Sequence, residues 1–277
     1  MPKFKKIELK KSNFQYLGGS RVLNRVKKRG KKSNPLISII TVVKNDKKKI
    51  SRTLKSVFNQ KYRNFEYIVI DGGSTDGTLE VLKKKQKKID IIICEKDRNL
   101  WEAMNKGILI SSGRIIGIIN SGDVFFKNTL NYVKKYFTSE KKIDYLFGPV
   151  KKDRILFRYE PEKIDYRFNI YPSHSTGFFI SYNAQKKVGL YDSKLGFGAD
   201  YNLIYKLIKN TKLKGKLAKK SDVFGKFDLK GFSSKIPFYK SYFYEMKIRH
   251  KNHQNIFYLF FLYWIKILNK IYRVIKN

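Results

Sequence analysis

The stretch LISIITVVKNDKKKISRTLKSVFNQKYRNFEYIVIDGGSTDGT, residues 36–78, holds the pattern that decides the fold. Residues 36–43 are an almost continuous run of β-branched and other apolar side chains, which predicts a strand buried on both faces. Residues 47–60 place apolar side chains at helical spacing, and residues 65–71 repeat the buried-strand pattern. A tight glycine turn follows, and Ser74, Thr75 or Asp76 is predicted to cap a helix over residues 74–85.

The alternation of strand and helix continues downstream. Residues 89–94 and 113–120 are predicted strands, and residues 99–112 are a predicted helix between them. Four strands alternating with helices predict an α/β fold with a mostly parallel central sheet flanked by helices. After residue 140 the pattern changes: we expect antiparallel strands within 145–160 and at 177–181, and helices over 183–192 and 199–210.

Polar side chains follow each of the four predicted strands. In open α/β sheets, ligands bind at the carboxyl ends of the strands, where such side chains gather. Because the chain contains few acids, several of them at one sheet edge predict a ligand site there. The residues concerned, at or just after the strand ends, are Thr41, Lys44, Asn45, Asp46, Asp71, Glu95, Asp97, Asn120, Ser121 and Asp123.

Composition excludes some classes of protein and leaves others open. The 277 residues include 61 Lys and Arg against 22 Asp and Glu, which gives a net charge of +39. This charge favours nucleic acid, anionic lipid or a phosphorylated substrate as partner, although a general bias toward Lys explains much of it equally well. A single cysteine, Cys94, excludes a disulfide framework and a cysteine zinc site, and three histidines without HExxH spacing argue against a zinc hydrolase.

Six segments, taken in this order, resemble the inverting glycosyltransferases of family 2, which have the GT-A fold. The nearest likeness is to bacterial enzymes of exopolysaccharide, capsule and lipopolysaccharide synthesis, including the colanic-acid type. The resemblance covers about residues 36–235, and FGKFDLKGFSSK (224–235) matches a late family segment in outline. The segments are the first strand, DGGSTDGT (71–78), EKDRNLWEAMNKGI (95–108), NSGD (120–123), PSHSTGFFIS (172–181) and FGADYNL (197–203).

The resemblance implies a reaction and a set of site residues. A sugar would pass from a nucleotide sugar, with UDP expected, to a hydroxyl of a glycan or lipid-linked acceptor, with a divalent Mn or Mg ion as cofactor. Asp71 corresponds to the acid that contacts the nucleotide base, Asp97 to a second acid on the nucleotide side, Asp123 to the metal ligand, and Asp200 to the catalytic base. His174 would contact the donor phosphate or the acceptor. Further contacts with the donor are assigned to Thr41, Val43, Gly73, Asn105 and Ser121.

The sequence departs from the family pattern at three places. Asn99 replaces a loop glycine, Ser175 replaces a glutamine, and the metal-binding DxD element reads Ser121-Gly122-Asp123, without its first acid. These changes bear on the donor sugar and on metal affinity rather than on the fold.

Two alternative functions remain open on the residues alone. A basic nucleic-acid-binding protein fits the charge, but no helix-turn-helix, zinc-finger or RNP-like segment is present, and the acids would repel a polyanion. A sugar nucleotidyltransferase would share the sheet and the metal site, but the Gly-rich loop expected near the first strand is missing.

We divide the chain into a basic N-terminal arm (1–34), a glycosyltransferase domain (35–235) and an aromatic, basic helical tail (236–277). No apolar run of secretory length follows the basic N-terminus, so a cytoplasmic location is expected. The tail's unbroken apolar run, residues 256–265, is about half of the roughly 20 residues that span a bilayer. It fits either a helix in the membrane interface, which would place the protein on the inner face of the cytoplasmic membrane, or a helix packed on the domain.

Overall fold

The computed structural model describes residues 14–24, 28–139, 142–166, 174–229 and 237–276. Its main sheet has eight strands in the order β1-β4-β3-β2-β5-β10-β7-β11. The strands β2 (Ile37–Val43), β3 (Phe65–Asp71), β4 (Ile91–Cys94) and β5 (Ile115–Ile118) run parallel to one another. The predicted parallel core is therefore confirmed.

Other strands extend this core on both sides. β1 (Tyr16–Gly18) pairs antiparallel with β4. On the opposite side, β10 (Phe178–Ser181) runs antiparallel between β5 and β7 (Tyr145–Phe147), and β11 (Gly215–Leu217) runs parallel to β7. The expected change to antiparallel pairing after residue 140 is thus confirmed for β10.

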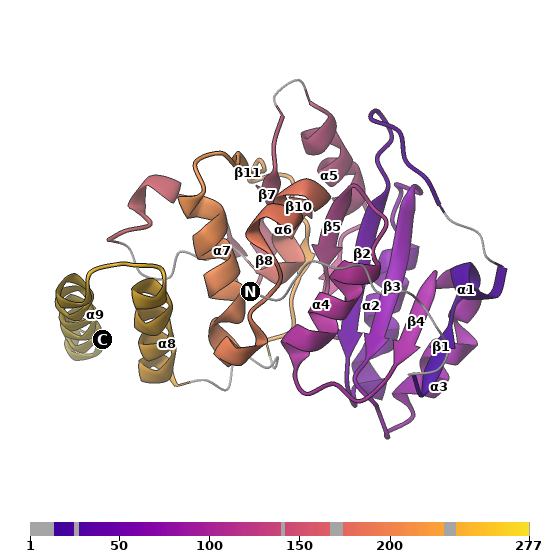
Figure 1. Ribbon diagram of the computed structural model, residues 1–277, viewed down its shortest axis with the longest axis horizontal. Coiled ribbons are helices and arrows are strands. Elements are labelled where there is room, and N and C mark those ends of the chain that lie inside the picture. Colours follow the sequence, from indigo (N-terminus) through magenta and orange to yellow (C-terminus); the bar gives the residue numbers. More distant parts are fainter. Residues whose placement is uncertain (1–13, 25–27, 140–141, 167–173, 230–236, 277) are drawn as a thin grey trace.

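Helices cover both faces of the sheet (Figure 1). On one face lie α4 (Leu100–Ile110), α6 (Tyr182–Val188) and α7 (Ala199–Lys209); on the other lie α2 (Lys47–Phe58), α3 (Thr78–Lys84) and α5 (Thr129–Thr138). Successive residues of β2 alternate between the two cores: Ile40 and Val42 pack toward α4, and Ile39 packs toward α2. Full burial of all seven β2 residues explains why the strand reads as a continuous apolar run.

A second sheet of four very short strands lies in the order β6-β12-β8-β9. The sequence analysis did not anticipate it as a separate sheet. Two-residue strands have too little length to show a periodic pattern, so only the three-dimensional pairing reveals them. The strands are β6 (Val124–Phe125), β8 (Val150–Lys151), β9 (Ile155–Leu156) and β12 (Gly225–Lys226), and short 3₁₀ turns occur at Gln86–Lys88, Pro161–Lys163, Ser175–Gly177 (η4) and Ser193–Gly198 (η5).

Two helices form the C-terminal end, α8 (Phe238–Lys251) and α9 (Ile256–Lys276), at the side of the molecule opposite β1 (Figure 1). α8 packs against η5 and α7, and α9 packs against α8. Among the described residues, no helix combines the length and the hydropathy that crossing a membrane requires.

The N-terminal segment differs in part from the expected basic arm. Residues 1–13 lie outside the described residues, but β1 and α1 (Ser20–Asn24) pack on the edge of the sheet, where Arg21 pairs with the buried Glu66 at 3.0 Å. This part of the segment therefore belongs to the folded domain. Its pairing depends on β4, 73 or more residues away, which local sequence patterns do not show.

Candidate active site

The loops that follow the four parallel strands lie side by side at one edge of the sheet. Backbone hydrogen bonds connect them in turn: Ser121 N–H donates to Val42 C=O at 3.3 Å, and Gly72 N–H donates to Val43 C=O at 2.9 Å. Glu95 N–H donates to Asp71 C=O at 3.1 Å. The motifs after β5, β2, β3 and β4 are thus brought together, as the strand-end argument predicts.

The DGGSTD turn after β3 holds Asp71 in place. Ser74 N–H donates to Asp71 Oδ1 at 2.8 Å, and Gly73 has a φ of 78°, which side-chain-bearing residues rarely adopt. The N-cap of α3 is Gly77 and not one of the three predicted capping residues, and no side chain makes an N-cap hydrogen bond there. Asp76, directly before it, accepts at Oδ1 from Thr78 N–H at 3.0 Å.

Asp71 and Asp97 each present one carboxylate oxygen without a partner. Asp71 is fully buried and Asp97 is 8% exposed, yet Oδ2 of each accepts no hydrogen bond within the described part of the chain. Asp97 Oδ2 lies close to Gly72, where an added Cβ would approach it to 3.7 Å. Burial raises the pKa of both carboxyl groups, and hydrogen bonds to Ser74 oppose the rise at Asp71. The Oδ2 atoms of Asp71 and Asp97 are therefore two buried acceptors that a bound ligand could supply with hydrogen-bond donors.

Lys106 of α4 supplies the positive charge that pairs with Asp97 and Glu95 in the loop after β4. Its ammonium group lies 2.7 Å from Asp97 Oδ1 and also contacts Glu95 Oε1, and Lys106 itself is 8% exposed. The hydrogen bond and the charge of Lys106 both oppose the raised pKa of Asp97. Lys106 thus keeps Asp97 in position with only one oxygen occupied.

Asp123 connects the NSGD loop to the η4 turn. Its Oδ2 accepts from Thr176 Oγ1 at 2.8 Å and its Oδ1 accepts from Asp228 N–H at 2.9 Å. Asp123 is 3% exposed, and burial raises its pKa to about 6. Asn120 faces the same turn, since its Nδ2 lies 3.4 Å from Ser175 Oγ, while its Oδ1 is buried without a partner among the described residues.

His174 lies beside Asp123, with 3.8 Å between its Nδ1 and Asp123 Oδ2. Its ring stacks on Phe227 with centroids 4.3 Å apart, and burial lowers its pKa to about 4. The ring is therefore neutral at pH 7. Nδ1 accepts from Thr176 N–H at 3.3 Å, which assigns the ring proton to Nε2.

The donor atoms around Asp123 fit a divalent cation of the Mn or Mg type. An ionised carboxylate offers about four lone-pair positions, and Thr176 and Asp228 use two of those on Asp123. The unpartnered Asn120 Oδ1 is a second oxygen of the kind that Mg²⁺ prefers. No group of three His, Cys, Asp or Glu residues suited to a metal occurs in the described ranges. Such an ion would therefore depend on substrate phosphates for further ligands.

Asp200 lies in the first turn of α7. Its Oδ1 accepts from Tyr201 N–H at 2.7 Å, and burial raises its pKa to about 6. The charge of Asp200 contributes to the raised pKa of Tyr191, so the two side chains are neighbours. A carboxyl group with a pKa near neutrality is suited to proton transfer.

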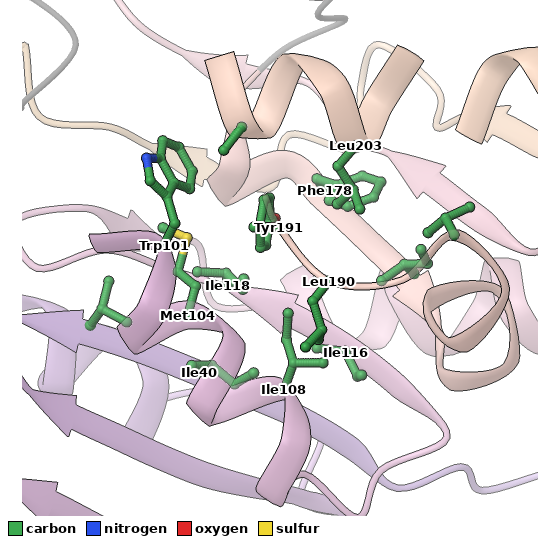
Figure 2. Close-up of a cluster of buried hydrophobic side chains, with 14 of the residues drawn as sticks. Ile40, Trp101, Met104, Ile108, Ile116, Ile118, Phe178, Leu190, Tyr191 and Leu203 are labelled. Atoms are coloured by element: carbon green, nitrogen blue, oxygen red, sulfur yellow. The ribbon is translucent and has the colours of Figure 1, made fainter. Parts of the chain in front are cut away.

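α4 connects the Asp97 region to the Asp200 region. Asn105 Nδ2 donates to Tyr191 C=O at 2.8 Å, and Tyr191 N–H donates to Asn105 Oδ1 at 2.9 Å. Trp101 packs against the Tyr191 ring with centroids 5.5 Å apart, and Figure 2 shows both in the apolar cluster that α4 shares with Leu203 of α7. One helix therefore carries the partner of Asp97 and the contacts that fix Tyr191 beside Asp200.

The remaining predicted donor contacts have other partners in the structure. Thr41 is fully buried, and its hydroxyl pairs with Tyr67 at 3.0 Å. Ser121 Oγ donates to Asp46 Oδ2 at 2.7 Å, and Val43 is buried at the end of β2. With Asn105 bonded to Tyr191, these residues shape the site through its framework, and their contacts with a donor stay predictions.

Several residues of the site were not singled out from the sequence. Thr176 and Asp228 both hold Asp123, and the sequence signal for them was only their place inside the segments 172–181 and 224–235. Residues 172–173 and 230–235 of those segments lie outside the described residues. Arg98, which directly follows Asp97, pairs with Glu102 at 2.6 Å.

Known proteins share this sequence pattern and this fold. Residues 38–193, more than half of the chain, match the family described as Glycosyl transferase family 2. The chain is 28% identical over 198 residues to the uncharacterized glycosyltransferase MJ1057 of Methanocaldococcus jannaschii, an alignment that covers 65% of this chain and 67% of that protein.

Two solved structures are similar in fold. The mannosyltransferase PcManGT of Pyrobaculum calidifontis, in complex with GDP-Man and Mn²⁺, has a TM-score of 0.60 and 15% identity over 80% of this chain and 65% of its own. S. aureus TarS 1-349, in complex with UDP-GlcNAc, has a TM-score of 0.58 and 17% identity over 76% of this chain and 65% of its own. The alignments thus span less than two thirds of either solved chain, and at these identities they establish the fold, which is GT-A.

The family match includes the strand ends that carry Asp71, Asp97 and Asp123. Two of these residues, Asp71 and Asp97, each present an unpartnered buried oxygen in the described part of the chain. Sequence and fold therefore lead to one conclusion: the chain belongs to glycosyltransferase family 2.

Proposed function

We propose that this chain transfers a sugar from a nucleoside diphosphate sugar, with UDP as the expected nucleotide, to a hydroxyl of a glycan or lipid-linked acceptor. The single observation that carries the proposal is the pair of buried, unpartnered oxygens, Asp71 Oδ2 and Asp97 Oδ2. Leaving a buried acceptor unsatisfied costs about 1–3 kcal/mol, so such oxygens are expected to receive donors from a ligand. The imide N–H of a uracil and the hydroxyls of a ribose are donors of this kind.

The proposed reaction is a single displacement with inversion. A lone pair of the acceptor oxygen forms a bond to the anomeric carbon while the bond from that carbon to the diphosphate oxygen breaks. The electron pair leaves with the nucleoside diphosphate, and Asp200 takes the acceptor's hydroxyl proton. Its pKa of about 6 lets it be ionised at neutral pH and still accept a proton during the reaction.

The diphosphate side of the reaction is assigned to the cluster around Asp123. A divalent cation held there by Asp123 and Asn120 Oδ1 would neutralise the charge that develops on the leaving diphosphate. His174, neutral and with its proton on Nε2, would donate a hydrogen bond to a phosphate oxygen or to the acceptor. The role of Thr176 and Asp228 is to hold the Asp123 carboxylate in one orientation.

The cellular setting that fits this chemistry is cell-surface polysaccharide biosynthesis at the inner face of the cytoplasmic membrane. Nucleotide sugars are made in the cytoplasm, and a lipid-linked acceptor would lie at the membrane surface. The family membership favours this function over a nucleic-acid-binding protein or a sugar nucleotidyltransferase, and the acids at the strand ends also disfavour binding of nucleic acid.

Binding of the nucleotide is the first test. We expect UDP with Mn²⁺ to raise the melting temperature, because a ligand that binds only the folded state stabilises it, and we expect EDTA to abolish transfer. Asp71→Asn should weaken UDP binding by about 10- to 100-fold through loss of a charged acceptor. Glu80→Gln, an exposed acid on α3, is the matched control and should bind UDP as the unaltered protein does. If no nucleoside diphosphate raises the melting temperature, the proposed function is wrong.

A further inference from the structure

The outermost helix, α9, is apolar on two opposite faces. One face packs on α8 through Leu259 and Leu262, which are 0% and 7% exposed. Lys266 lies on the same face, where its ammonium group is 3.2 Å from Glu245 and 3.7 Å from the centre of the Tyr242 ring. Packing on α8 therefore covers only one side of this helix.

The other face of α9 has no cover in the described part of the chain. Its large side chains recur at intervals of three, four or seven residues, which places them along one side of the helix, and their exposed fractions range from 59% to 80%. They are Phe257, Phe261, Trp264, Leu268 and Ile275. Three of the five are aromatic, and a large aromatic side chain presents about 150–250 Å². With each of the five more than half exposed, the patch reaches the upper end of the roughly 300–600 Å² of the largest apolar patch on a typical monomer.

We propose that this face of α9 docks on an anionic lipid bilayer and lies in its interfacial region. The charge of the segment is complementary to such a surface: residues 238–276 contain eight Lys and Arg and a single acid, Glu245. Aromatic and apolar residues on one side of a basic helix are typical of helices that lie in the interface. The helix lies on the bilayer rather than crossing it, because no described helix meets the requirements for spanning.

A second copy of the chain is a less favourable occupant of this face. Two copies would bring two segments of the same positive charge together, in a protein whose net charge is +39. An anionic bilayer instead gains from every Lys and Arg near its surface.

The contacts of α8 show how a docked α9 would orient the rest of the enzyme. Glu245, which binds Lys266 of α9, accepts from the Tyr201 hydroxyl of α7 at 2.6 Å, and Arg249 Nε donates to the same hydroxyl at 3.1 Å. Arg249 is fully buried and also donates to Ile164 C=O at 2.8 Å. A buried polar network thus joins the lipid-facing helix to the residue that follows Asp200. The orienting role rests on the proposed use of a lipid-linked acceptor, whereas the docking itself does not.

Vesicle flotation of the full chain tests the docking. We expect it to float with vesicles of phosphatidylglycerol and much less with phosphatidylcholine. The triple variant F261S/W264S/L268S should lose about tenfold or more of this binding, since apolar insertion supplies much of the interfacial affinity. The matched control is L23S/I155S/Y166S, which removes three exposed apolar side chains outside α9 (39–59% exposed) and should float as the unaltered protein does.

The outcomes separate this inference from the proposed function. UDP binding should be equal in both triple variants, because their substitutions lie outside the donor site. Flotation of the α9 variant at the level of the unaltered protein overturns the inference. The inference is also overturned if the unaltered protein is a dimer that does not bind vesicles and the α9 variant is a monomer, because a second copy would then cover the face. Normal flotation without any nucleotide binding would instead reject the transferase proposal and leave the docking surface standing.

Discussion

The ammonium group of Lys106 lies 2.7 Å from Asp97 Oδ1, and both side chains are buried. Lys106→Met would leave Asp97 and Glu95 without their cation. Removing one partner of a buried ion pair costs about 3–5 kcal/mol, and we expect a loss of this size in the free energy of unfolding at pH 7, measured by urea denaturation. Lys96→Met, on an exposed neighbour, should change it by less than about 0.5 kcal/mol.

The loss in Lys106→Met should depend on pH in a defined direction. Burial already raises the pKa of Asp97, and removing Lys106 raises the folded-state value further. When the pKa of a carboxyl group is higher in the folded than in the unfolded state, ionisation lowers the free energy of unfolding. The loss begins as pH rises above the pKa of the unfolded state, about 3.9, and grows up to the pKa of the folded state. The deficit should therefore be smallest near pH 4 and grow toward pH 7. A deficit independent of pH would show that the lost packing of Lys106, not its charge, is responsible.

Asn105 is predicted from the family resemblance to contact the donor, but in the structure its side-chain amide bonds to the backbone of Tyr191 through both its nitrogen and its oxygen. Asn105→Ala should therefore cost about 1–3 kcal/mol of stability. It should also lower kcat by misplacing the segment beside Asp200. UDP affinity, measured by calorimetry, should stay unchanged. Asn59→Ala, at an exposed position, is the control. If UDP affinity falls as far as in Asp71→Asn, Asn105 contacts the nucleotide as the family resemblance implies.

The fold could be predicted where burial imposes a pattern on the sequence. β2 and β3 are buried along their whole length, so both appear in the sequence as apolar runs, and the helix between them, α2, has one apolar face. The expected antiparallel strands within 145–160 are confirmed for β8 and β9. β1 and the grouping of the shortest strands into a second sheet were missed, because strands of two or three residues are specified by pairing with distant segments such as Ile91–Cys94. The single expected tail is in fact two helices, joined at residues 252–255, where His253 has a φ of 67°.

The sequence predicts which acids lie at the strand ends, but it does not predict which side chains hold those acids in place. Asp71, Asp97 and Asp123 followed from their place after buried strands, whereas the partners that hold them, such as Lys106 and Thr176, depend on how α4 and the η4 turn pack. In a chain with 61 Lys and Arg, no sequence pattern singles out the one lysine that is buried against Asp97. The network of Glu245 and Arg249 left only the weak signal of an i, i+4 pair.

Tyr201 provides a test of that network in stability. Tyr201→Phe removes the hydroxyl that donates to Glu245 and accepts from Arg249, and leaves both buried groups short of a partner. We expect a loss of about 1–3 kcal/mol in the free energy of unfolding. Tyr166→Phe, at a position that is also 53% exposed, should be neutral within about 0.5 kcal/mol. Equal effects of the two substitutions would mean that the network contributes nothing measurable.

The pH dependence of turnover tests the proposed base. Burial raises the pKa of Asp200 to about 6, and only the ionised carboxylate accepts a proton. We therefore expect kcat to rise about tenfold per pH unit well below pH 6 and to level off above about pH 7. Asp200→Asn should lower kcat by about 10²- to 10⁴-fold, remove this inflection and leave UDP affinity unchanged. Asp165→Asn, an exposed acid paired with Lys209, should retain the full profile. An inflection near pH 6 that survives in Asp200→Asn would assign the proton transfer to another group, and Asp200 would then be a residue that orients Tyr191 and the start of α7.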